Sequence, residues 1–278
     1  MVTNPAHALT VEIGGRRWQV APQGHDLSIP LAFNAAQPSF FGAPAAAEAA
    51  ITAGTFVGDV RRGGSCNCST YTLTPHCNGT HTECVGHVTA ERIDVREEAR
   101  EHLSAALLIS IEAATTEAAT EISDPPPRPG DRLITRTALA AAAVPHDLKQ
   151  YRALVVRTKP NPASKRHRNY DAGEPSPYFT ADAMRWIAEC GVRTLVVDLP
   201  SVDRANDEGR LTTHRIFWGL PPGAKSAAQA ARRGATITEL AFIDDTIADG
   251  PYLLNLQVAP FVTDAAPSRP ILFPLLPT

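Results

Sequence analysis

The sequence predicts an α/β fold in which a β-rich first half precedes a core of alternating strands and helices. In the second half, β-branched runs are typical of buried strands, and apolar residues at helical spacing separate them. The expected strands are 153–158, 194–198 and 237–243, and the expected helices run from Thr180 to the Gly191 stop and over 227–233. This alternation favours an α/β core. We expect residues 1–278 to form a single domain, since the chain is within the range of one α/β enzyme core.

The first half is punctuated by glycine and proline and contains mainly extended segments. Residues 9–21 alternate polar and apolar side chains around Gly14-Gly15, which predicts a β-hairpin. We expect a short helix over 45–53, extended backbone over 66–88 with a turn at Asn78-Gly79, and a strand over 104–114. The proline run that follows is too short to separate two cores and is interpreted as a surface loop.

The composition argues against several classes of protein. A formal net charge of −3 and scattered basic residues do not favour nucleic acid or an anionic membrane as a partner. The segment Met1–His7 lacks the pattern of a secretory signal, and no run reaches the roughly 20 apolar residues of a spanning helix. Five cysteines, an odd number, favour reduced thiols. We therefore expect a cytoplasmic protein.

Four side chains that can bind a metal ion follow one another at odd positions: Cys77, His81, Glu83 and His87. In extended backbone, residues of one parity point to the same side. We therefore expect Cys77, His81 and Glu83 to converge on one ion, with His87 entering from the next turn. His76 is out of phase with this set and ranks below Cys77 as a ligand.

A thiolate, an imidazole and a carboxylate together favour Zn²⁺, because sulfur binds hard ions such as Mg²⁺ poorly. Gly79 and Thr80 are small and allow the backbone to approach a cation closely. Three protein ligands leave coordination positions for water, which Zn²⁺ acidifies towards neutral pH. The pattern therefore indicates a metal-dependent hydrolase.

Three other interpretations remain open at this stage. The stretch could hold polar side chains packed in a loop, with its cysteines acting as small hydrophobic groups. Cys66, Cys68, Cys77 and Cys84 could form a structural zinc knot, although their spacing differs from the usual paired C-x₂₋₄-C hooks. Cys84 and His87 could act as nucleophile and base, although no third group that would orient the histidine is evident.

The stretch from Cys77 to His87 resembles the H-x-G-T-H-x-D-x-P-x-H signature of the cyclase-like metal hydrolases, the family of bacterial kynurenine formamidase and isatin hydrolase. The resemblance extends in chain order from Asp26 to Arg269. It includes segments similar to the family's D-[IL]-S, G-I-D-T-P-S-x-D, L-x-x-H-R-x-L and S-P-x-R motifs, which are Asp26–Ser28, Gly191–Asp203, Thr213–Ile216 and Pro267–Arg269. In this chain a cysteine replaces the first motif histidine, Glu83 replaces an aspartate, and a valine replaces the proline.

The resemblance implies roles for individual residues. His81 and Glu83 correspond to metal ligands, His87 to a ligand or catalytic base, and His214 to a downstream histidine that helps close the site. Glu239 is the best match to the family's distal glutamate, a ligand and a second candidate for proton transfer. The expected metal ligands are thus Cys77, His81, Glu83, His87, His214 and Glu239, and the expected catalytic residues are His87 and Glu239.

Three aromatic residues, Phe40, Phe41 and Trp218, are candidates for the wall of the substrate pocket. The segment that begins at Phe41 stands where the family often has an aromatic turn. Core packing explains each of the three residues at least as well at this stage.

The resemblance also implies an activity and an architecture. The expected enzyme is a metal-dependent amidohydrolase that uses a metal-bound hydroxide to cleave C–N bonds other than peptide bonds. Its substrate would be a small amide, formamide or cyclic amide, as for the arylformamidase of tryptophan catabolism. The family has a β-rich swivelling β/β/α-type domain, one or two ions, Zn²⁺ in preference to Mn²⁺, and assembles as a homodimer or higher homo-oligomer. The alternative is a degenerate, non-catalytic member that binds a small molecule or a structural zinc.

Overall fold

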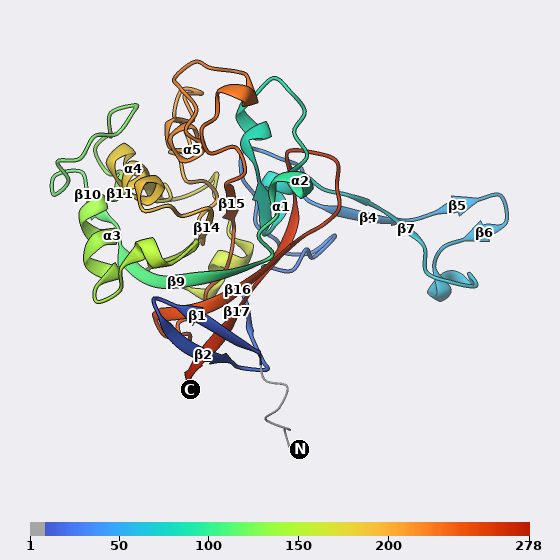
Figure 1. Ribbon diagram of the computed structural model, residues 1–278. Coiled ribbons are helices and arrows are strands. Elements are labelled where there is room, and N and C mark those ends of the chain that lie inside the picture. Colours follow the sequence, from blue (N-terminus) through green and yellow to red (C-terminus); the bar gives the residue numbers. More distant parts are fainter. Residues whose placement is uncertain (1–8) are drawn as a thin grey trace.

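The computed structural model of the protein describes residues 9–278 and is a strand-rich α/β structure (Figure 1). The segment Met1–His7, on which the expectation of no secretory signal rests, lies outside the described residues. The strands are β1 (Thr10–Ile13), β2 (Arg16–Val20), β3 (His25–Asp26), β4 (Ala47–Ala50), β5 (Thr52–Ala53), β6 (Phe56–Val57), β7 (Ser69–Thr72), β8 (His81–Glu83), β9 (Leu103–Glu112), β10 (Ala114–Thr115), β11 (Arg132–Ile134), β12 (Ala153–Lys159), β13 (Tyr178–Phe179), β14 (Thr194–Val197), β15 (Thr236–Glu239), β16 (Gly250–Val258) and β17 (Ala265–Pro277).

The helices are short. The α-helices are α1 (Pro75–Asn78), α2 (Val95–Glu98), α3 (Arg136–Ala143), α4 (Ala181–Glu189) and α5 (Thr212–Trp218). The 3-10 turns are η2 (Val60–Arg62), η3 (Val85–Val88), η4 (Leu148–Gln150), η5 (Ala163–His167) and η6 (Ala227–Gln229). Within the described part of the chain, none of the helices has the length and apolar character needed to cross a membrane.

The main sheet closes into a barrel. Its strands follow the order β17-β16-β9-β12-β14-β15-β8, and β8 pairs with β17 to complete the ring. Strands β9, β12, β14 and β15 run parallel to one another, as expected for strands joined by crossover connections, whereas β16 is antiparallel to β9. β8 is antiparallel to both of its partners and is only three residues long. The closing seam of the barrel therefore depends on this short strand.

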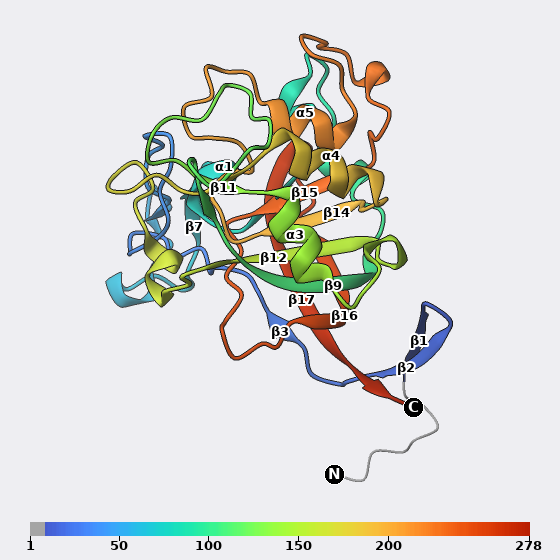
Figure 2. The same ribbon diagram turned by 90° about the vertical axis from the view of Figure 1, so that its left-hand side faces the viewer.

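The hydrophobic core lies on both faces of these strands. Along β9, Leu107 and Ile109 belong to the cluster that packs against α3, α4 and α5, whereas Ala106 and Leu108 belong to a second cluster on the opposite face. This division follows from the alternation of side chains in a strand. Figure 2 shows the helices α3 and α4 in front of the strands that they cover.

A long β-arm extends away from the barrel (Figure 1). It is formed by the pairs β4–β7 and β5–β6 and is mostly exposed. Here the sequence prediction was wrong, because the expected helix over 45–53 is part of the arm. Its alanines have a high helix propensity, but pairing of Ala47–Ala50 with Ser69–Thr72 outweighs that local preference.

Most of the predicted core elements are confirmed. The hairpin β1–β2, the strands β9, β12 and β14, and the helix α4 with its Thr180 cap lie where the sequence places them. The strand predicted over 237–243 is confirmed in its first part only, because β15 ends at Glu239. The predicted helix over 227–233 was wrong, since only the 3-10 turn η6 forms there. The prediction of continuous extended backbone over 66–88 was also wrong, because α1 and η3 interrupt it.

The barrel core should be sensitive to loss of side-chain volume on β9. Leu107 is fully buried, whereas Leu103 in the same strand is 55% exposed. We expect Leu107→Ala to lower the free energy of unfolding by about 2–5 kcal/mol, and Leu103→Ala, the matched control, to change it by less than about 1 kcal/mol. Urea unfolding measures both values, and equal effects would contradict the assigned burial.

Candidate metal centre

The short strand β8 places two potential metal ligands on one face of the barrel wall. His81 and Glu83 alternate with Thr82 along the strand, so both point to the same side. The register pairs His81 with Glu239 of β15, and residues opposite each other in adjacent strands lie on the same face. The Thr82 hydroxyl faces the other way and lies 2.7 Å from the Thr238 hydroxyl. Pairing across the barrel seam thus brings His81, Glu83 and Glu239 together.

Four further side chains reach this face from segments far apart in the sequence. His76 comes from α1, His87 from η3 and His214 from α5, while Asp264 immediately precedes β17. His87 follows Glu83 by four residues and lies in the 3-10 turn η3, which begins directly after the extended residue Cys84. The result is a cluster of four imidazoles and three carboxylates: His76, His81, Glu83, His87, His214, Glu239 and Asp264.

Glu83 lies at the centre of this cluster. Its Oε1 atom is 2.9 Å from Nε2 of His214, and its Oε2 atom is 3.1 Å from Nδ1 of His76. His87 Nδ1 is 3.7 Å from Oε2. Glu239 lies on the far side, with its two carboxylate oxygens 3.6 Å from His81 Nε2 and 3.5 Å from His214 Nε2. The ring nitrogens therefore face the carboxylates from several directions.

The buried polar atoms of the cluster fit a divalent cation. Both carboxylate oxygens of Glu83 and the Nε2 atoms of His81 and His214 are buried without a hydrogen-bond partner. Although Glu83 Oε1 and His214 Nε2 are close, they are not aligned as acceptor and donor. Unsatisfied buried polar atoms are costly, and a cation bound between them would satisfy all four. Imidazole and carboxylate ligands suit Zn²⁺ and related transition metals.

Three of the imidazoles are fixed by an acceptor on the ring nitrogen that faces away from the cluster. Nδ1 of His81 is 3.1 Å from the Gly79 carbonyl oxygen, and Nδ1 of His214 is 2.6 Å from the Asp203 carboxylate. Nε2 of His76 is 2.9 Å from Asp264. Because each acceptor requires a proton on the nitrogen that it contacts, the opposite nitrogen is free to bind a metal.

Asp203 also fixes the backbone that carries His214. Its carboxylate accepts hydrogen bonds from the amides of Thr213 and His214 at the beginning of α5. Asp203 therefore stabilises the turn that leads into α5. Asp198, the other carboxylate of that segment, forms a buried ion pair with Lys165 at 2.7 Å and does not belong to the cluster.

The electrostatics reflect opposite charges in close contact. Burial alone would raise the pKa of Glu83, but the imidazoles of His87 and His214 outweigh it and hold that pKa well below its usual value. Burial opposes protonation of His76, yet the Asp264 hydrogen bond and the Glu83 carboxylate raise the pKa of His76 to about 10. Glu83 and Asp203 likewise outweigh burial and raise the pKa of His214. In the absence of a cation, the imidazoles themselves supply the positive charge.

Three overlapping groups in the described part of the chain have the spacing of metal ligands. They are His76, His81 and Glu83; Glu83, His87 and His214; and His76, His87 and Asp264, each with one atom per residue within 4.8 Å of the others. The first two groups share Glu83. Glu83 is therefore the carboxylate that the two groups would have in common if each held a cation.

The structure brings together five of the six predicted ligands. His81, Glu83, His87, His214 and Glu239 all lie in the cluster, including Glu239, whose assignment spans a 25-residue separation from His214. Cys77 belongs to none of the three ligand groups found in residues 9–278. Burial, reinforced by the Asp171 and Glu239 carboxylates, raises the pKa of its thiol to about 11.

His76 occupies the position that the sequence analysis gave to Cys77. The parity argument was wrong here because residues 75–78 form a helical turn, in which adjacent side chains diverge by about 100° instead of alternating between two faces. Thr74 followed by Pro75 is a typical beginning of a helix and was the available signal. Asp264 was missed entirely, since it lies 188 residues from His76.

The structure also bears on the cysteine alternatives. Cys66 and Cys68 are exposed on the β-arm, whereas Cys77 and Cys84 are buried. No group of metal-ligand spacing within residues 9–278 contains a cysteine, which argues against a zinc knot. Cys84 lies in the hydrophobic core, where burial raises its pKa to about 12. A buried protonated thiol is a poor nucleophile.

Phe40 and Phe41 have different environments. Phe40 is buried among Ile29, Tyr170 and other apolar residues, so packing accounts for it. Phe41 is 63% exposed and has a positive φ of 55°, an uncommon conformation for a bulky residue. Asp171 stabilises this turn by accepting hydrogen bonds from the amides of Phe41 and Gly42 at 2.9 and 2.8 Å.

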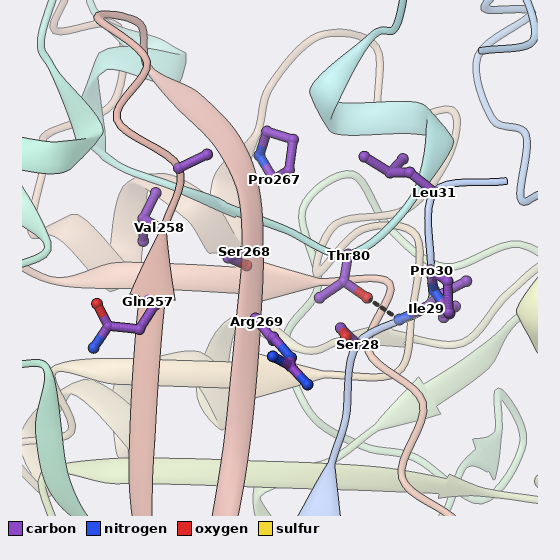
Figure 3. Close-up of a pocket in the computed structure, with 11 residues that line it drawn as sticks. Ser28, Ile29, Pro30, Leu31, Thr80, Gln257, Val258, Pro267, Ser268 and Arg269 are labelled. Atoms are coloured by element: carbon purple, nitrogen blue, oxygen red, sulfur yellow. Dashed lines mark hydrogen bonds between the residues drawn. The ribbon is translucent and has the colours of Figure 1, made fainter. Parts of the chain in front are cut away.

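A cavity of about 400 Å³ lies beside the beginning of β8 but is separate from the cluster (Figure 3). It lies between the segment Ser28–Leu31 and residues Pro267–Arg269 of β17. Thr80 lines it, accepts a hydrogen bond from the Ile29 amide at 2.7 Å and donates one to the Leu240 carbonyl oxygen. These bonds fix the residue that precedes His81, and none of the cluster side chains lines this cavity.

Comparison with known proteins identifies the family to which the chain belongs. The sequence model of the Cyclase family matches residues 25–204, which is more than half of the chain. The chain belongs to the Cyclase family. It is 30% identical over 103 residues to kynurenine formamidase of Bacillus cereus, and 30% identical over 100 residues to the kynurenine formamidase of Bacillus thuringiensis strain Al Hakam. These matches cover 37% and 36% of this chain, and 42% and 41% of the relatives. The chain thus spans less than half the length of these curated relatives.

Solved structures share the Cyclase-family fold. Isatin hydrolase A from Labrenzia aggregata superposes with a TM-score of 0.60 at 16% identity, over 92% of this chain and 94% of that protein. A protein described as a predicted metal-dependent hydrolase from Bacillus stearothermophilus gives 0.57 at 18% identity, over 90% and 98% of the two chains. At these identities the similarity establishes the fold.

The metal-free Cyclase-family cluster should be most stable in mildly acidic solution. The pKa of His76, about 10, lies above its ordinary 6.5, so its stabilising contribution is complete below pH 6.5 and is lost as the pH rises through 10. The pKa of Glu83 lies below its ordinary 4.5, so its contribution is present above pH 4.5 and is lost as the pH falls. We expect the free energy of unfolding in urea with a chelator present to be largest between pH 4.5 and 6.5.

In His76→Gln, the free energy of unfolding should fall less as the pH rises above 6.5, because the variant lacks one of the groups that lose a proton there. His102→Gln, a change at an exposed histidine outside the cluster, is the control. A metal-free protein whose stability increases from pH 7 to 10 would contradict the assigned ion pairs.

Proposed function

We propose that this protein is a metal-dependent amidohydrolase that acts on a small amide, formamide or cyclic amide. The observation that carries the proposal is the set of unpartnered atoms on His81, Glu83 and His214, which are buried and face one another. Two unpaired carboxylate oxygens in a protein interior are strongly unfavourable without a positive partner. The similarity to kynurenine formamidases and to the fold of isatin hydrolase supports the same class of reaction.

His81, Glu83, His214 and Glu239 would hold the cation or cations. Zn²⁺ suits this set, with Mn²⁺ as the second choice. When bound, the cation would supply Lewis-acid chemistry, polarising the amide carbonyl and lowering the pKa of water. Glu239 suits a ligand role, because it is buried and one of its oxygens accepts the Val202 amide hydrogen bond at 2.8 Å.

His87 is the residue best placed to move the proton. Its side chain is 27% exposed, and its Nδ1 atom lies 3.7 Å from Glu83 and 3.5 Å from Asp264. Since its ring is accessible, it can accept a proton from the attacking water and deliver it to the leaving nitrogen as the C–N bond breaks. The products are a carboxylic acid and an amine, which remain in one molecule when the substrate is cyclic.

Phe41 is the candidate for contact with the non-reacting part of the substrate. Asp171 accepts a hydrogen bond from the backbone amide of Phe41, and the turn that carries this residue is connected to α1 by a hydrogen bond from Asn78 to the Pro44 carbonyl oxygen at 3.1 Å. An exposed aromatic ring in an otherwise unfavourable conformation suggests a functional constraint. An aryl group on the substrate would give this ring a stacking partner.

The first prediction of this proposal concerns metal dependence. Wild-type protein purified without chelator should contain a transition metal and hydrolyse N-formylkynurenine or isatin, and dialysis against a chelator should abolish the activity. Glu83→Gln should lose both metal and activity, because it removes the charge shared by two ligand groups. Glu12→Gln, at an exposed strand position, should change neither.

Metal content is measured by mass spectrometry and hydrolysis by absorbance. Activity that survives complete metal removal would exclude the proposed mechanism. Bound metal with no hydrolysis of any small amide would instead favour the non-catalytic alternative.

The second prediction separates proton transfer from metal binding. His87→Ala should lower kcat by about 10²–10⁴-fold, with metal content close to that of the wild type. His81→Ala should lower metal content as well, because Nε2 of His81 is one of the buried unpartnered atoms. Loss of metal in His87→Ala would assign His87 as a ligand and contradict its proposed role.

The third prediction concerns substrate contact. Phe41→Ala should raise KM for an aryl amide by about 2–10-fold, the range of an aromatic pair, while kcat changes little. Phe56→Ala, at an exposed phenylalanine on the β-arm, is the matched control. An unchanged KM in Phe41→Ala would exclude stacking on this ring.

A further inference from the structure

The helical turn α1 presents two adjacent side chains near the metal centre, and only one of them can face it. His76 Nδ1 is 3.1 Å from Glu83 Oε2 and belongs to two of the ligand groups. Cys77 is the next residue, and neighbouring residues in a helical turn do not face the same point. The sulfur atom is absent from every ligand group in the described part of the chain.

We propose that His76, and not Cys77, is the metal ligand contributed by α1, and that Asp264 is the residue that positions it. This inference rests on the metal site of the proposed function and adds one ligand and one positioning residue to it. Neither residue is among the ligands expected from the sequence motif.

The hydrogen-bond geometry determines which nitrogen of His76 is available. The Asp264 carboxylate can only accept, and its Oδ2 atom is 2.9 Å from His76 Nε2, so Nε2 carries the proton. Once a cation displaces the proton of Nδ1, the lone pair of that nitrogen faces the space beside Glu83 Oε2, which is 3.1 Å away. His81 and His214 show the same arrangement, with Gly79 and Asp203 as their acceptors. The ring of His76 is thus oriented by a hydrogen-bond acceptor in the same way as the rings of His81 and His214.

The chain around Asp264 is tightly packed against the segment that carries His87. The Cys84 amide donates to the Asp264 carbonyl oxygen at 3.0 Å, and the Thr263 hydroxyl donates to the Asp264 carboxylate at 3.0 Å. A Cβ atom on Gly86 would lie 3.1 Å from Asp264 Cβ, so glycine permits the close approach. Asp264 Oδ2 is also 3.5 Å from His87 Nδ1. One carboxylate therefore contacts both the inferred ligand and the proposed proton carrier.

Cobalt titration tests this assignment without a substrate. Metal-free wild-type, His76→Ala, Cys77→Ser and Asp264→Asn proteins would be titrated with Co²⁺, with affinity and absorption spectrum as readouts and far-ultraviolet circular dichroism as the check on folding. Asp264→Asn should weaken Co²⁺ binding by about 10–100-fold, the usual effect of removing an outer-shell partner. His76→Ala should weaken it at least as much, and Cys77→Ser should bind like the wild type.

The spectrum gives an independent result. A thiolate ligand produces a sulfur-to-cobalt charge-transfer band in the near ultraviolet, and we expect none in the wild type. Such a band, lost in Cys77→Ser, would overturn the assignment, as would unchanged affinity in either His76→Ala or Asp264→Asn. Asp264→Asn preserves side-chain size, so the test does not depend on the folding of His76→Ala.

The outcomes distinguish this inference from the proposed function. A wild type that binds no Co²⁺ overturns both. A wild type that binds Co²⁺ with the expected order of variants, but hydrolyses no amide, overturns the enzymatic function alone. Normal hydrolysis together with a thiolate band overturns the His76 assignment alone.

Discussion

The constraint on which the rest of the site depends is the burial of the Glu83 carboxylate. It has no exposed surface, and neither oxygen has a hydrogen-bond partner. An uncompensated buried charge costs several kcal/mol, so the surroundings must supply positive charge. In the metal-free protein that charge comes from the imidazoles of His76 and His214, whose pKa values are raised by the neighbouring carboxylates. The same nitrogens become ligands once a cation replaces their protons, so metal binding and proton release are coupled.

This constraint also explains why the site lies at the seam of the barrel. β8 closes the ring between β15 and β17, and its three residues alternate between two roles. On one face, the Thr82 hydroxyl is hydrogen-bonded to the hydroxyls of Thr238 and Ser268. On the other face, His81 and Glu83 belong to the cluster. A closing strand cannot shift its register by one residue without reversing both faces. Closure of the fold and placement of the ligands are therefore a single structural event.

The sequence predicted those parts of the protein that depend on local patterns. Buried β-branched runs identified β12 and β14, and the order of motifs identified His214 and Glu239 although long segments separate them from β8. It failed where tertiary pairing outweighs propensity, as in the alanine-rich strand β4. The parity argument failed at α1 because it assumed extended backbone. The contact of Asp264 with His76 could not be predicted from local patterns, because the two residues are 188 positions apart and meet only when the barrel closes.

His76 and Cys77 are neighbours in α1, but only the side chain of His76 faces Glu83. A motif specifies positions along the chain, whereas a metal ion binds where the lone pairs of several ligand atoms point to one place. A turn of helix at α1 rotates the side chain of residue 76 towards Glu83, and Asp264 then fixes its ring nitrogen. If His76 is the ligand, the nitrogen that the motif places at residue 77 is supplied by the preceding residue, and a carboxylate from another segment orients it. In this interpretation, the acceptors behind the imidazoles define the ligand set as much as the ligands themselves do.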